Sequence, residues 1–511
     1  MLLACTTMAN AATPEQLQDL DATVERVRAQ FDVPGIAVAV VKDGQVVLER
    51  GWGVREQGKP EPVQADTLFA IASNTKAFTA TSLNLLAEDG KLKMDDKVID
   101  HLPSFRMSDP FVTGQMTIRD LLSHRSGLSL GAGDLLFWPT TSYSNAEVVE
   151  RLGKVPLKGG FRESYAYDNI LYAVAQQMIE HVSGMSYQQF LQTRIFDKVG
   201  MAGTRYNADH LKPGDKAAVG HAKFDFKDLR TVAPLTWSNN AGAGGIYSSA
   251  HDMARWMQVQ LAEGKLANGT PLFTDKSQQQ MWRMITPQSI PAPSVPELAL
   301  ARANFAGYGE GWSLSDYRGQ KLVWHTGGWP GMVSRLTLVP GEKLGVVVLT
   351  NQEVGAAFNA ITLSVLDAYF GGEKHDWVDA YAKGVAKGQD KADEAWAKHQ
   401  AERDRGSRPS LPLAGYAATY RDRWYGDMVV TAEGKGLRLR FAKTAQLSGR
   451  LEHWQHDTFI VRWDDRSLNA DAFVNFSLDP DGKVREVRMQ PTSDLTDFSF
   501  DFQDLLFTPV K

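Results

Sequence analysis

Residues 69–80 read FAIASNTKAFTA, and this stretch decides the fold. The apolar run 67–72 indicates a strand, and the apolar spacing over 73–89 indicates a helix that Gly90 ends. Ser73 and Lys76 stand three residues apart at the start of this helix, so their side chains share one face. The stretch therefore predicts a strand that enters a helix, with a hydroxyl group beside an amine.

A serine beside a lysine suits nucleophilic catalysis. A serine hydroxyl is a weak nucleophile that needs a neighbouring base, and a lysine in a partly desolvated cleft can lose its proton near neutral pH. The helix N-terminus adds a backbone N–H and a positive dipole end. Taken alone, however, the pattern of Ser73 and Lys76 is explained more simply as an ordinary helix cap.

The flanking sequence places this stretch between the two halves of a sheet. An amphipathic helix over 16–31 precedes a strand pair over 35–51 that is broken at Asp43-Gly44, a strong hairpin dipeptide. Helical signals dominate the middle of the chain, for example at 117–124 and 169–182, and strands return at 311–317, 321–324, 333–339 and 344–350 before a helix at 356–369. We expect an α/β (α+β) fold, with an antiparallel sheet built from both chain ends, a helical subdomain and an active site in the cleft between them.

Two further motifs carry chemical groups. Tyr167-Asp168-Asn169 precedes the 169–182 helix; a tyrosine near a lysine can shuttle a proton, and an asparagine amide can hold a substrate carbonyl. His325-Thr326-Gly327-Gly328 follows the 321–324 strand, and its glycines allow close approach of a substrate. Taken alone, each motif is explained better by an ordinary structural role: a buried aromatic beside a helix cap for the first, and a strand end with a glycine turn for the second.

Together the motifs resemble those of the penicillin-recognising serine hydrolases, which include class C β-lactamases, D-aminopeptidases and D-Ala-D-Ala carboxypeptidases. The resemblance covers about residues 16–372. It extends to these further stretches: Leu121-Leu122-Ser123-His124-x-Ser126-Gly127-Leu128, Gly244-Gly245-Ile246-Tyr247-Ser248 and His325-Thr326-Gly327-Gly328-x-Pro330-Gly331.

The resemblance implies a role for each motif residue. Ser73 is the acylated nucleophile, Lys76 its base, and Tyr167 passes a proton to the leaving atom and activates the deacylating water. Asn169 holds the acyl side of the substrate. The remaining roles fall to the third motif: Thr326 and Gly327 hold the substrate strand, the N–H groups of Ser73 and Gly328 form the oxyanion hole, and His325 adds a donor or a titrating charge.

The sequence departs from the class C pattern at one position. Those enzymes carry lysine in the third motif where this chain has His325, as peptidase members of the group do. The loss of a permanent cation, together with the negative charge of Asp168, argues against efficient β-lactamase action. We expect an acyl-enzyme hydrolase of amide or peptide bonds, with D-amino-acid or modified peptides among its substrates. The alternatives are a carboxylesterase or weak β-lactamase using the same site, and a penicillin-binding sensor with little turnover.

The chain divides into four segments. Residues 1–13 form a remnant of an export signal or a disordered tail, and 14–372 the hydrolase domain. The segment 373–410 is rich in Ala, Lys, Asp, Glu and Gln and is typical of a charged helical linker. Short alternating stretches separated by turns over 411–511 indicate a small antiparallel β-barrel, which resembles the lipocalin-like domain of some peptidases in this group.

Composition excludes several function classes. The 511 residues contain 55 Lys+Arg and 60 Asp+Glu, a net charge of −5, so there is no basic excess for binding nucleic acid. No apolar run reaches the length of a membrane span. The single cysteine, Cys5, excludes internal disulfides and Cys-rich zinc sites. We expect no metal or cofactor and a small-molecule or peptide substrate; homo-oligomerisation is left open.

The N-terminus bears on localisation. Met1-Leu2-Leu3-Ala4-Cys5 resembles the end of a lipoprotein signal, which would make Cys5 a lipid anchor, and residues 9–11 resemble a signal-peptidase site. A disordered tail explains the same residues equally well. We expect an exported, periplasmic or envelope-associated protein.

Three other patterns are interpreted as decoys. Ser129 lies in a Gly-x-Ser-x-Gly match that lacks the strand before it, so we expect a loop residue. His453 and His456 lack a third metal ligand and are expected to pack or to lie on the surface. The glycines of 242–245 lack the spacing of a dinucleotide fingerprint and are expected to form backbone at the cleft edge.

Overall fold

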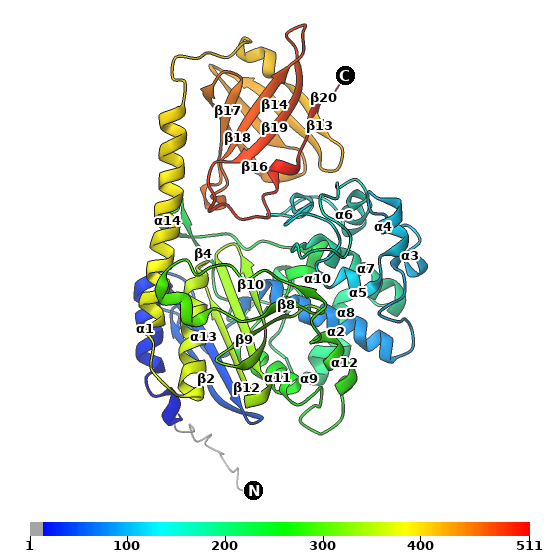
Figure 1. Ribbon diagram of the computed structural model, residues 1–511, viewed down its shortest axis with the longest axis vertical. Helices are drawn as coiled ribbons and strands as arrows, with labels where there is room; N and C mark the ends of the chain where they lie inside the picture. Colours follow the sequence, from blue (N-terminus) through cyan, green and yellow to red (C-terminus); the bar gives the residue numbers. More distant parts are fainter. Residues whose placement is uncertain (1–13, 511) are drawn as a thin grey trace.

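The computed structural model describes residues 14–510 (Figure 1). Cys5 and the expected signal or tail of residues 1–13 lie outside the described residues. The first of two large sheets is antiparallel, with the strand order β2-β1-β12-β11-β10-β9-β8-β7. Its strands are β1 Gly35–Lys42, β2 Gln45–Gly53, β7 Thr286–Pro287, β8 Ala306–Tyr308, β9 Ser313–Tyr317, β10 Gln320–Trp329, β11 Met332–Val339 and β12 Leu344–Thr350.

The expectation that both chain ends build this sheet is confirmed, because β1 pairs with β12 from Ile36 opposite Thr350 to Lys42 opposite Leu344. Strand β1 is buried almost throughout and its residues alternate between two cores. Ile36 and Val38 join the core formed with α1 Leu20–Phe31 and α13 Gly355–Phe370, whereas the intervening small residues face the core of α2 Thr75–Glu88 and α11 Ala250–Leu261. Helices therefore cover both faces, which explains the unbroken apolar run of this strand.

The sequence misplaced the end of one strand. The apolar run predicted a strand over 321–324 followed by a turn, but β10 continues to Trp329 and contains the whole of the third motif. It continues because β11 pairs with it from Val323 to Trp329. Ladder hydrogen bonds to a neighbouring strand thus hold glycines that have little strand propensity of their own.

The helical region lies between the two halves of the sheet. The fourteen-residue helix α7, Ile170–Ser183, is buried over most of its length up to Ile179 and packs against α2. The other helices here are α3 Val98–His101, α4 Pro110–Gln115, α5 Ile118–Leu121, α6 Asn145–Leu152, α8 Tyr187–Leu191, α9 Asp197–Val199, α10 Ala241–Gly244 and α12 Asp275–Met281. Two short strand pairs complete the region: β3 Phe69–Ala70 with β6 Tyr247–Ser248, and β4 His221–Phe224 with β5 Asp228–Thr231.

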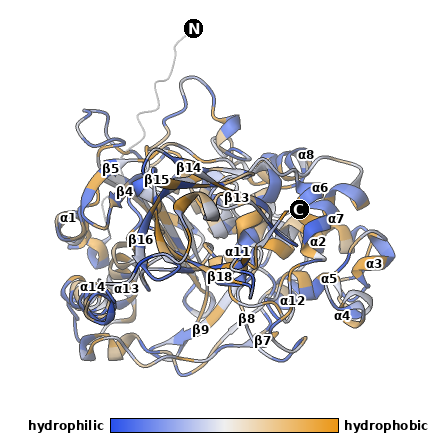
Figure 2. Ribbon diagram, turned by 90° about the horizontal axis from the view of Figure 1, so that it is seen from above, coloured by the Kyte–Doolittle hydropathy of each residue, from blue (hydrophilic) through white to orange (hydrophobic). Residues whose placement is uncertain are grey.

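A long helix, α14 Trp377–Glu402, follows and runs along one side of the molecule to the C-terminal sheet (Figure 1). Its largely hydrophilic surface is visible from above in Figure 2. The Asp376 side chain caps its start by accepting from the N–H of Asp379, and the buried Trp377 anchors this end against α13. The helix lies within the expected charged linker, whose boundaries stay a prediction.

The second sheet is an eight-stranded antiparallel barrel with the order β19-β18-β17-β16-β15-β14-β13-β20. Its strands are β13 Ala418–Asp422, β14 Gly426–Glu433, β15 Gly436–Phe441, β16 Thr444–Gln455, β17 Thr458–Trp463, β18 Ala472–Leu478, β19 Val484–Pro491 and β20 Thr508–Pro509. Paired backbone hydrogen bonds between Val487 and Phe507 bring the two edges together, so the barrel is nearly closed. The expected antiparallel barrel is confirmed, and its lipocalin-like character stays a prediction.

Candidate active site

Ser73 lies on a tight turn between a strand and a helix. Strand β3 ends at Ala70, and the 3-10 turn Ala72–Asn74 leads directly into α2. Ala72 adopts a positive φ of 46°, an uncommon value for a residue with a side chain, which turns the chain sharply just before the serine. Ala72 and Asn74 are buried while Ser73 remains partly exposed, so the turn presents the serine hydroxyl at the surface of the fold.

The turn is fastened to the neighbouring sheet. The Asn74 amide donates to the Ser334 hydroxyl at 2.8 Å, and this hydroxyl donates to the carbonyl of Ile71 at 2.7 Å. Both groups are buried, so each bond satisfies a polar atom that water cannot reach. The position of Ser73 is therefore fixed relative to β11 rather than by the helix alone.

Lys76 is fully buried one turn further along. Its amine contacts three oxygens: Ser73 Oγ at 3.0 Å, Asn169 Oδ1 at 2.7 Å and the Ala243 carbonyl at 2.9 Å. Burial lowers the pKa of this amine from 10.5 to about 7, although nearby Asp134 and Asp168 oppose the shift. A substantial fraction of Lys76 is consequently neutral near pH 7.

The geometry directs the lone pair of the neutral amine. The Ala243 carbonyl can only accept a hydrogen bond, and so can Asn169 Oδ1, because the nitrogen of that amide donates to the carboxylate of Asp134 at 2.8 Å. These two acceptors take both hydrogens of the neutral amine. Its lone pair is then left facing Ser73 Oγ, the arrangement needed to accept the proton of the serine hydroxyl.

Tyr167 lies over this pair, with its ring centroid 5.0 Å from the Lys76 amine. Burial raises the pKa of its hydroxyl well above 10, and an interaction with Ser73 offsets this only in part. The hydroxyl therefore stays protonated at neutral pH. The ring of buried His124 lies under it at 4.2 Å between centroids, and the Asp168 carboxylate is turned away into the interior, where the Ser126 hydroxyl donates to it at 3.0 Å.

His325 lies close by, buried, and its ring carries no charge. Its Nδ1 must donate, because the partner at 2.6 Å is the Thr326 carbonyl, and in the neutral ring Nε2 then accepts from the Tyr308 hydroxyl at 2.8 Å. Burial and the neighbouring Lys76 lower the pKa of His325 to about 3. The imidazole is thus held as a single neutral tautomer whose two nitrogens are both occupied.

The other residues of the third motif lie on an open strand edge. Strand β9 pairs with β10 only as far as Trp324, so within residues 14–510 no strand covers that edge from His325 onward. Gly327 packs directly on the turn before Ser73: a Cβ atom here would lie 2.2 Å from the Ile71 carbonyl oxygen. A Cβ at Gly328 would meet no atom within 4 Å, and Thr326 is partly exposed. The structure therefore brings Ser73, Lys76, Asn169 and this edge together, as the motifs predict.

Sequence reasoning missed a second group of site residues. Asp134 is fully buried and accepts from Asn169, and the Ser499 hydroxyl of the C-terminal sheet region donates to the same carboxylate oxygen at 2.8 Å. Phe498, a residue 39% exposed, meets Tyr167 in an edge-to-face arrangement with 5.9 Å between ring centroids. No local motif marks these residues, because Asp134 lies 35 positions before the Asn169 that it contacts and Ser499 lies 365 positions after Asp134.

The residues interpreted above as decoys lie at positions that agree with the structural roles expected for them. Ser129 lies in a loop, where its hydroxyl donates to the Asp504 carboxylate at 3.1 Å. His453 contacts the backbone carbonyl of His456 at 2.9 Å, and within residues 14–510 no group of three or more His, Cys, Asp or Glu could hold a metal ion. Of the glycine stretch, residues 242–244 lie in α10 and Gly245 caps its end, and the helix places the Ala243 carbonyl against Lys76. Across the same described residues, no helix is both long and apolar enough to span a bilayer.

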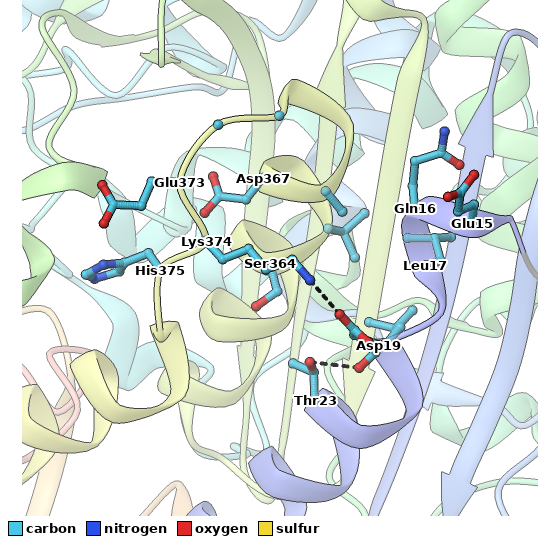
Figure 3. Close-up of a pocket in the computed structure, with 15 residues that line it drawn as sticks. Glu15, Gln16, Leu17, Asp19, Thr23, Ser364, Asp367, Glu373, Lys374 and His375 are labelled. Carbon is cyan, nitrogen blue, oxygen red and sulfur yellow. Dashed lines mark hydrogen bonds and ion pairs between the residues drawn. The ribbon is translucent and has the colours of Figure 1, made fainter.

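A separate cavity of about 320 Å³ lies beside α1 and the C-terminal end of α13, on the opposite face of the sheet from α2 (Figure 3). At its rim Lys374 forms an ion pair with Asp19 at 2.7 Å, and the Asp367 carboxylate is already occupied by Tyr317 and Trp377. None of the predicted site residues lines this cavity.

The fold and the grouping of Ser73, Lys76 and Asn169 define the class of β-lactamase- and transpeptidase-like proteins. Residues 20–369 match the Beta-lactamase family, and the chain belongs to that family. The resemblance to penicillin-recognising proteins found in the sequence is thereby confirmed. Residues 402–509 match a domain of unknown function, DUF3471.

Relatives in this family include proteins named as hydrolases and as penicillin-binding proteins. The chain is 27% identical over 510 residues to "Unguisins hydrolase ungD" of Aspergillus violaceofuscus, which covers 92% of this chain and 87% of that protein. It is 28% identical over 360 residues to "Penicillin-binding protein 4*" of Bacillus subtilis, covering 66% and 73% respectively. The octameric penicillin-binding protein homologue from Pyrococcus abyssi shares the fold, with a TM-score of 0.60 at 20% identity over 96% of this chain and 100% of that one.

Proposed function

We propose that the protein is a serine hydrolase that cleaves amide or peptide bonds, including those of D-amino-acid or modified peptides, through an acyl-enzyme on Ser73. One observation carries the proposal: the Lys76 amine lies 3.0 Å from Ser73 Oγ while both of its other contacts are acceptors. Because burial lowers the pKa of this amine to about 7, it can take the serine proton without a histidine.

The proposed reaction has two halves. In acylation, Lys76 takes the proton of Ser73, Oγ bonds to the substrate carbonyl carbon, and Tyr167 gives its proton to the leaving nitrogen as the C–N bond breaks, regaining one from Lys76. In deacylation, Tyr167 and Lys76 remove a proton from water, whose oxygen bonds to the acyl carbon, and the Ser73 oxygen leaves with a proton. The high pKa of Tyr167 suits a hydroxyl that relays protons rather than one that persists as a phenolate.

The strand edge supplies the proposed binding groups. The N–H groups of Ser73 and Gly328 form the oxyanion hole, and Thr326 and Gly327 align the substrate along β10, whose edge β9 leaves open from His325 onward. Asn169 borders the acyl side while its oxygen orients Lys76.

Charge favours amides over β-lactams as substrates. A β-lactam carboxylate calls for a cation on the third motif, and His325 there is neutral. Asp168 places negative charge near Lys76, and Asp134 adds to it only as it ionises near its raised pKa of about 8. The relative named as an unguisins hydrolase also supports hydrolytic turnover rather than a pure sensor.

A labelling experiment tests the proposal. The purified protein is treated with a fluorophosphonate, the modified residue is mapped by mass spectrometry, and turnover is compared on p-nitrophenyl esters, nitrocefin and a panel of D- and L-amino-acid amides and peptides. Ser73→Ala should abolish labelling, whereas the matched control Ser129→Ala, another partly exposed serine, should leave it unchanged. Label on another residue, or turnover of nitrocefin above that of every amide, would overturn it.

We also propose export to the cell envelope, lipid attachment at Cys5 and assembly of several copies. The similarity to a homologue described as octameric supports only the last. Mass spectrometry of the native N-terminus and light scattering of the purified protein test these points separately.

A further inference from the structure

A line of hydrogen bonds connects the Lys76 amine to the C-terminal sheet region. Lys76 donates to Asn169 at 2.7 Å, Asn169 donates to Asp134 at 2.8 Å, and Ser499 donates to the same oxygen of Asp134 at 2.8 Å. Each of these four residues is buried, with at most 4% of its surface exposed. Water therefore cannot reach these hydrogen bonds or compete for their donors and acceptors.

We propose that Asp134 is a positioning residue for the Lys76 base: it fixes the Asn169 amide that orients the amine, and Ser499 from the barrel region holds Asp134 in place. This inference rests on the proposed function. It adds a residue that no motif marks and gives the C-terminal region a part in catalysis.

Hydrogen bonds also hold the backbone on both sides of Asp134. The Asp501 carboxylate accepts from the N–H of Gly133 at 2.7 Å and from the N–H of Leu135 at 3.2 Å. Ser499 and Asp501 belong to one short segment of the C-terminal region, so a single segment supplies three hydrogen bonds around Asp134. A carboxylate placed to bind two donors on one oxygen in this way is sensitive to any displacement of that segment.

The Asn169 amide must keep one orientation for this to work. Its nitrogen finds an acceptor in Asp134, so its oxygen is the end that faces Lys76. Without Asp134, the amide could rotate and present its NH₂ group to the amine, and two donors would then face each other. The lone pair of the neutral amine would no longer be directed at Ser73.

The charged groups that face Lys76 and Asp134 set the expected pH behaviour. Burial raises the pKa of Asp134 to about 8, and Asp497 adds to this while Lys76 opposes it. Asp501, whose own pKa is raised by burial and by Asp134, lies on the same side. Asp168, although its carboxylate is turned toward Ser126, also favours the ammonium form of Lys76 through its charge.

Tyr167, His124 and His325 surround the pair without adding charge, because burial keeps the tyrosine protonated and both imidazoles neutral. The ionised form of Asp134 is thus one of two carboxylates that favour the ammonium form of Lys76. Because the pKa of Asp134 is raised to about 8, its carboxyl is mostly protonated while Lys76 titrates near 7, so removing the ionisable group should change the pKa of the amine little.

The test separates orientation from charge with two substitutions in the full-length protein. Asp134→Asn keeps an oxygen that accepts from Asn169 but cannot ionise; Asp134→Ala removes the acceptor altogether. Fluorophosphonate labelling rate and kcat/KM on a turned-over ester or amide are measured across the neutral pH range. Asp422→Asn is the matched control. Asp422, like Asp134, is a buried carboxylate, but it lies in the barrel and accepts from backbone N–H groups.

Asp134→Asn should retain labelling within a few-fold and keep the acidic limb of its pH profile close to that of the wild type, because the pKa of Asp134 is raised to about 8 and its carboxyl is mostly protonated where Lys76 titrates. Asp134→Ala should lose roughly 100-fold in labelling rate, as expected when a catalytic group is displaced by about 1 Å. Ser499→Ala should fall between the two, and Asp422→Asn should match the wild type in both rate and pH profile.

Some results would overturn the inference while leaving the proposed function intact. If wild-type Ser73 is labelled but both Asp134 variants match it in rate and pH profile, Asp134 does not position the base. If Asp134→Ala and Asp422→Asn lose labelling equally and in step with their melting temperatures, the effect is one of stability alone. An unlabelled Ser73 in the wild type would instead remove the proposed function itself.

Discussion

Gly327→Ala tests whether the third motif must contact the serine turn. The added Cβ would lie 2.2 Å from the Ile71 carbonyl oxygen, 2.5 Å from the Ser334 hydroxyl and 2.9 Å from the Cβ of Ala72. Two of these atoms belong to the turn that carries Ser73, and neither can be removed by rotating a side chain. Strand β10 must therefore retreat from the turn by about 1 Å to restore ordinary contact.

The consequences can be estimated for both activity and stability. A displacement of about 1 Å between the oxyanion donors proposed at Ser73 and Gly328 should lower kcat/KM by roughly 100-fold, equivalent to about 2.7 kcal/mol of transition-state stabilisation. Overpacking should also cost about 1–3 kcal/mol of folding free energy. The melting temperature should accordingly fall by a few degrees.

The neighbouring glycine is the natural control for stability. A Cβ at Gly328 meets no atom within 4 Å, so Gly328→Ala should have the same melting temperature as the wild type. Both variants are compared by thermal denaturation followed by circular dichroism, by fluorophosphonate labelling rate and by kcat/KM on the best ester or amide. The comparison distinguishes close packing on the turn from any general intolerance of alanine in this strand.

Wild-type kcat/KM and melting temperature in Gly327→Ala would refute the reasoning. The contact between β10 and the serine turn would then be looser than the structure indicates. A low melting temperature in both variants would equally contradict it, because the open space at Gly328 leaves no steric reason for destabilisation.

Three further predictions follow from the site. The acylation rate should rise with pH through about 7, because Lys76 acts in its neutral form. Lys76→Arg should abolish acylation at every pH, since arginine stays protonated. A pH–rate profile that is flat between about pH 6 and 8 would contradict this. Tyr167→Phe should reduce amide turnover by about 100- to 10,000-fold through loss of the proton relay, and slow fluorophosphonate labelling less; equal losses in the two assays would argue against a relay. Phe498→Ala should lower kcat/KM by about 2- to 10-fold, which corresponds to the interaction energy of one aromatic pair. Leu495→Ala, at a similarly exposed residue, should leave kcat/KM unchanged.

Local sequence patterns predicted much of this protein because they record local physics. The spacing of Ser73 and Lys76 at the start of a helix follows from helical periodicity, and the hairpin at Asp43-Gly44 from turn chemistry. The extent of β10 was wrong because pairing with β11, not strand propensity, carries the strand through its glycines. Strand β16, with polar residues on its outward face and a register shift, also gave no clear signal.

By itself, then, the sequence determined which chemical groups are present and which lie close along the chain: the hydroxyl and amine of the first motif, the tyrosine and amide of the second, and the glycines of the third. Only the tertiary structure decided their electrostatic state and their supports. His325 is neutral because burial and the nearby Lys76 penalise its charge, which the hydrogen bond to the Thr326 carbonyl offsets only in part, and no residue pattern reveals that burial. Asp134 contacts Ser499 across 365 positions because the chain folds the C-terminal region back onto the hydrolase core, and a contact so distant in sequence leaves no local periodicity to detect.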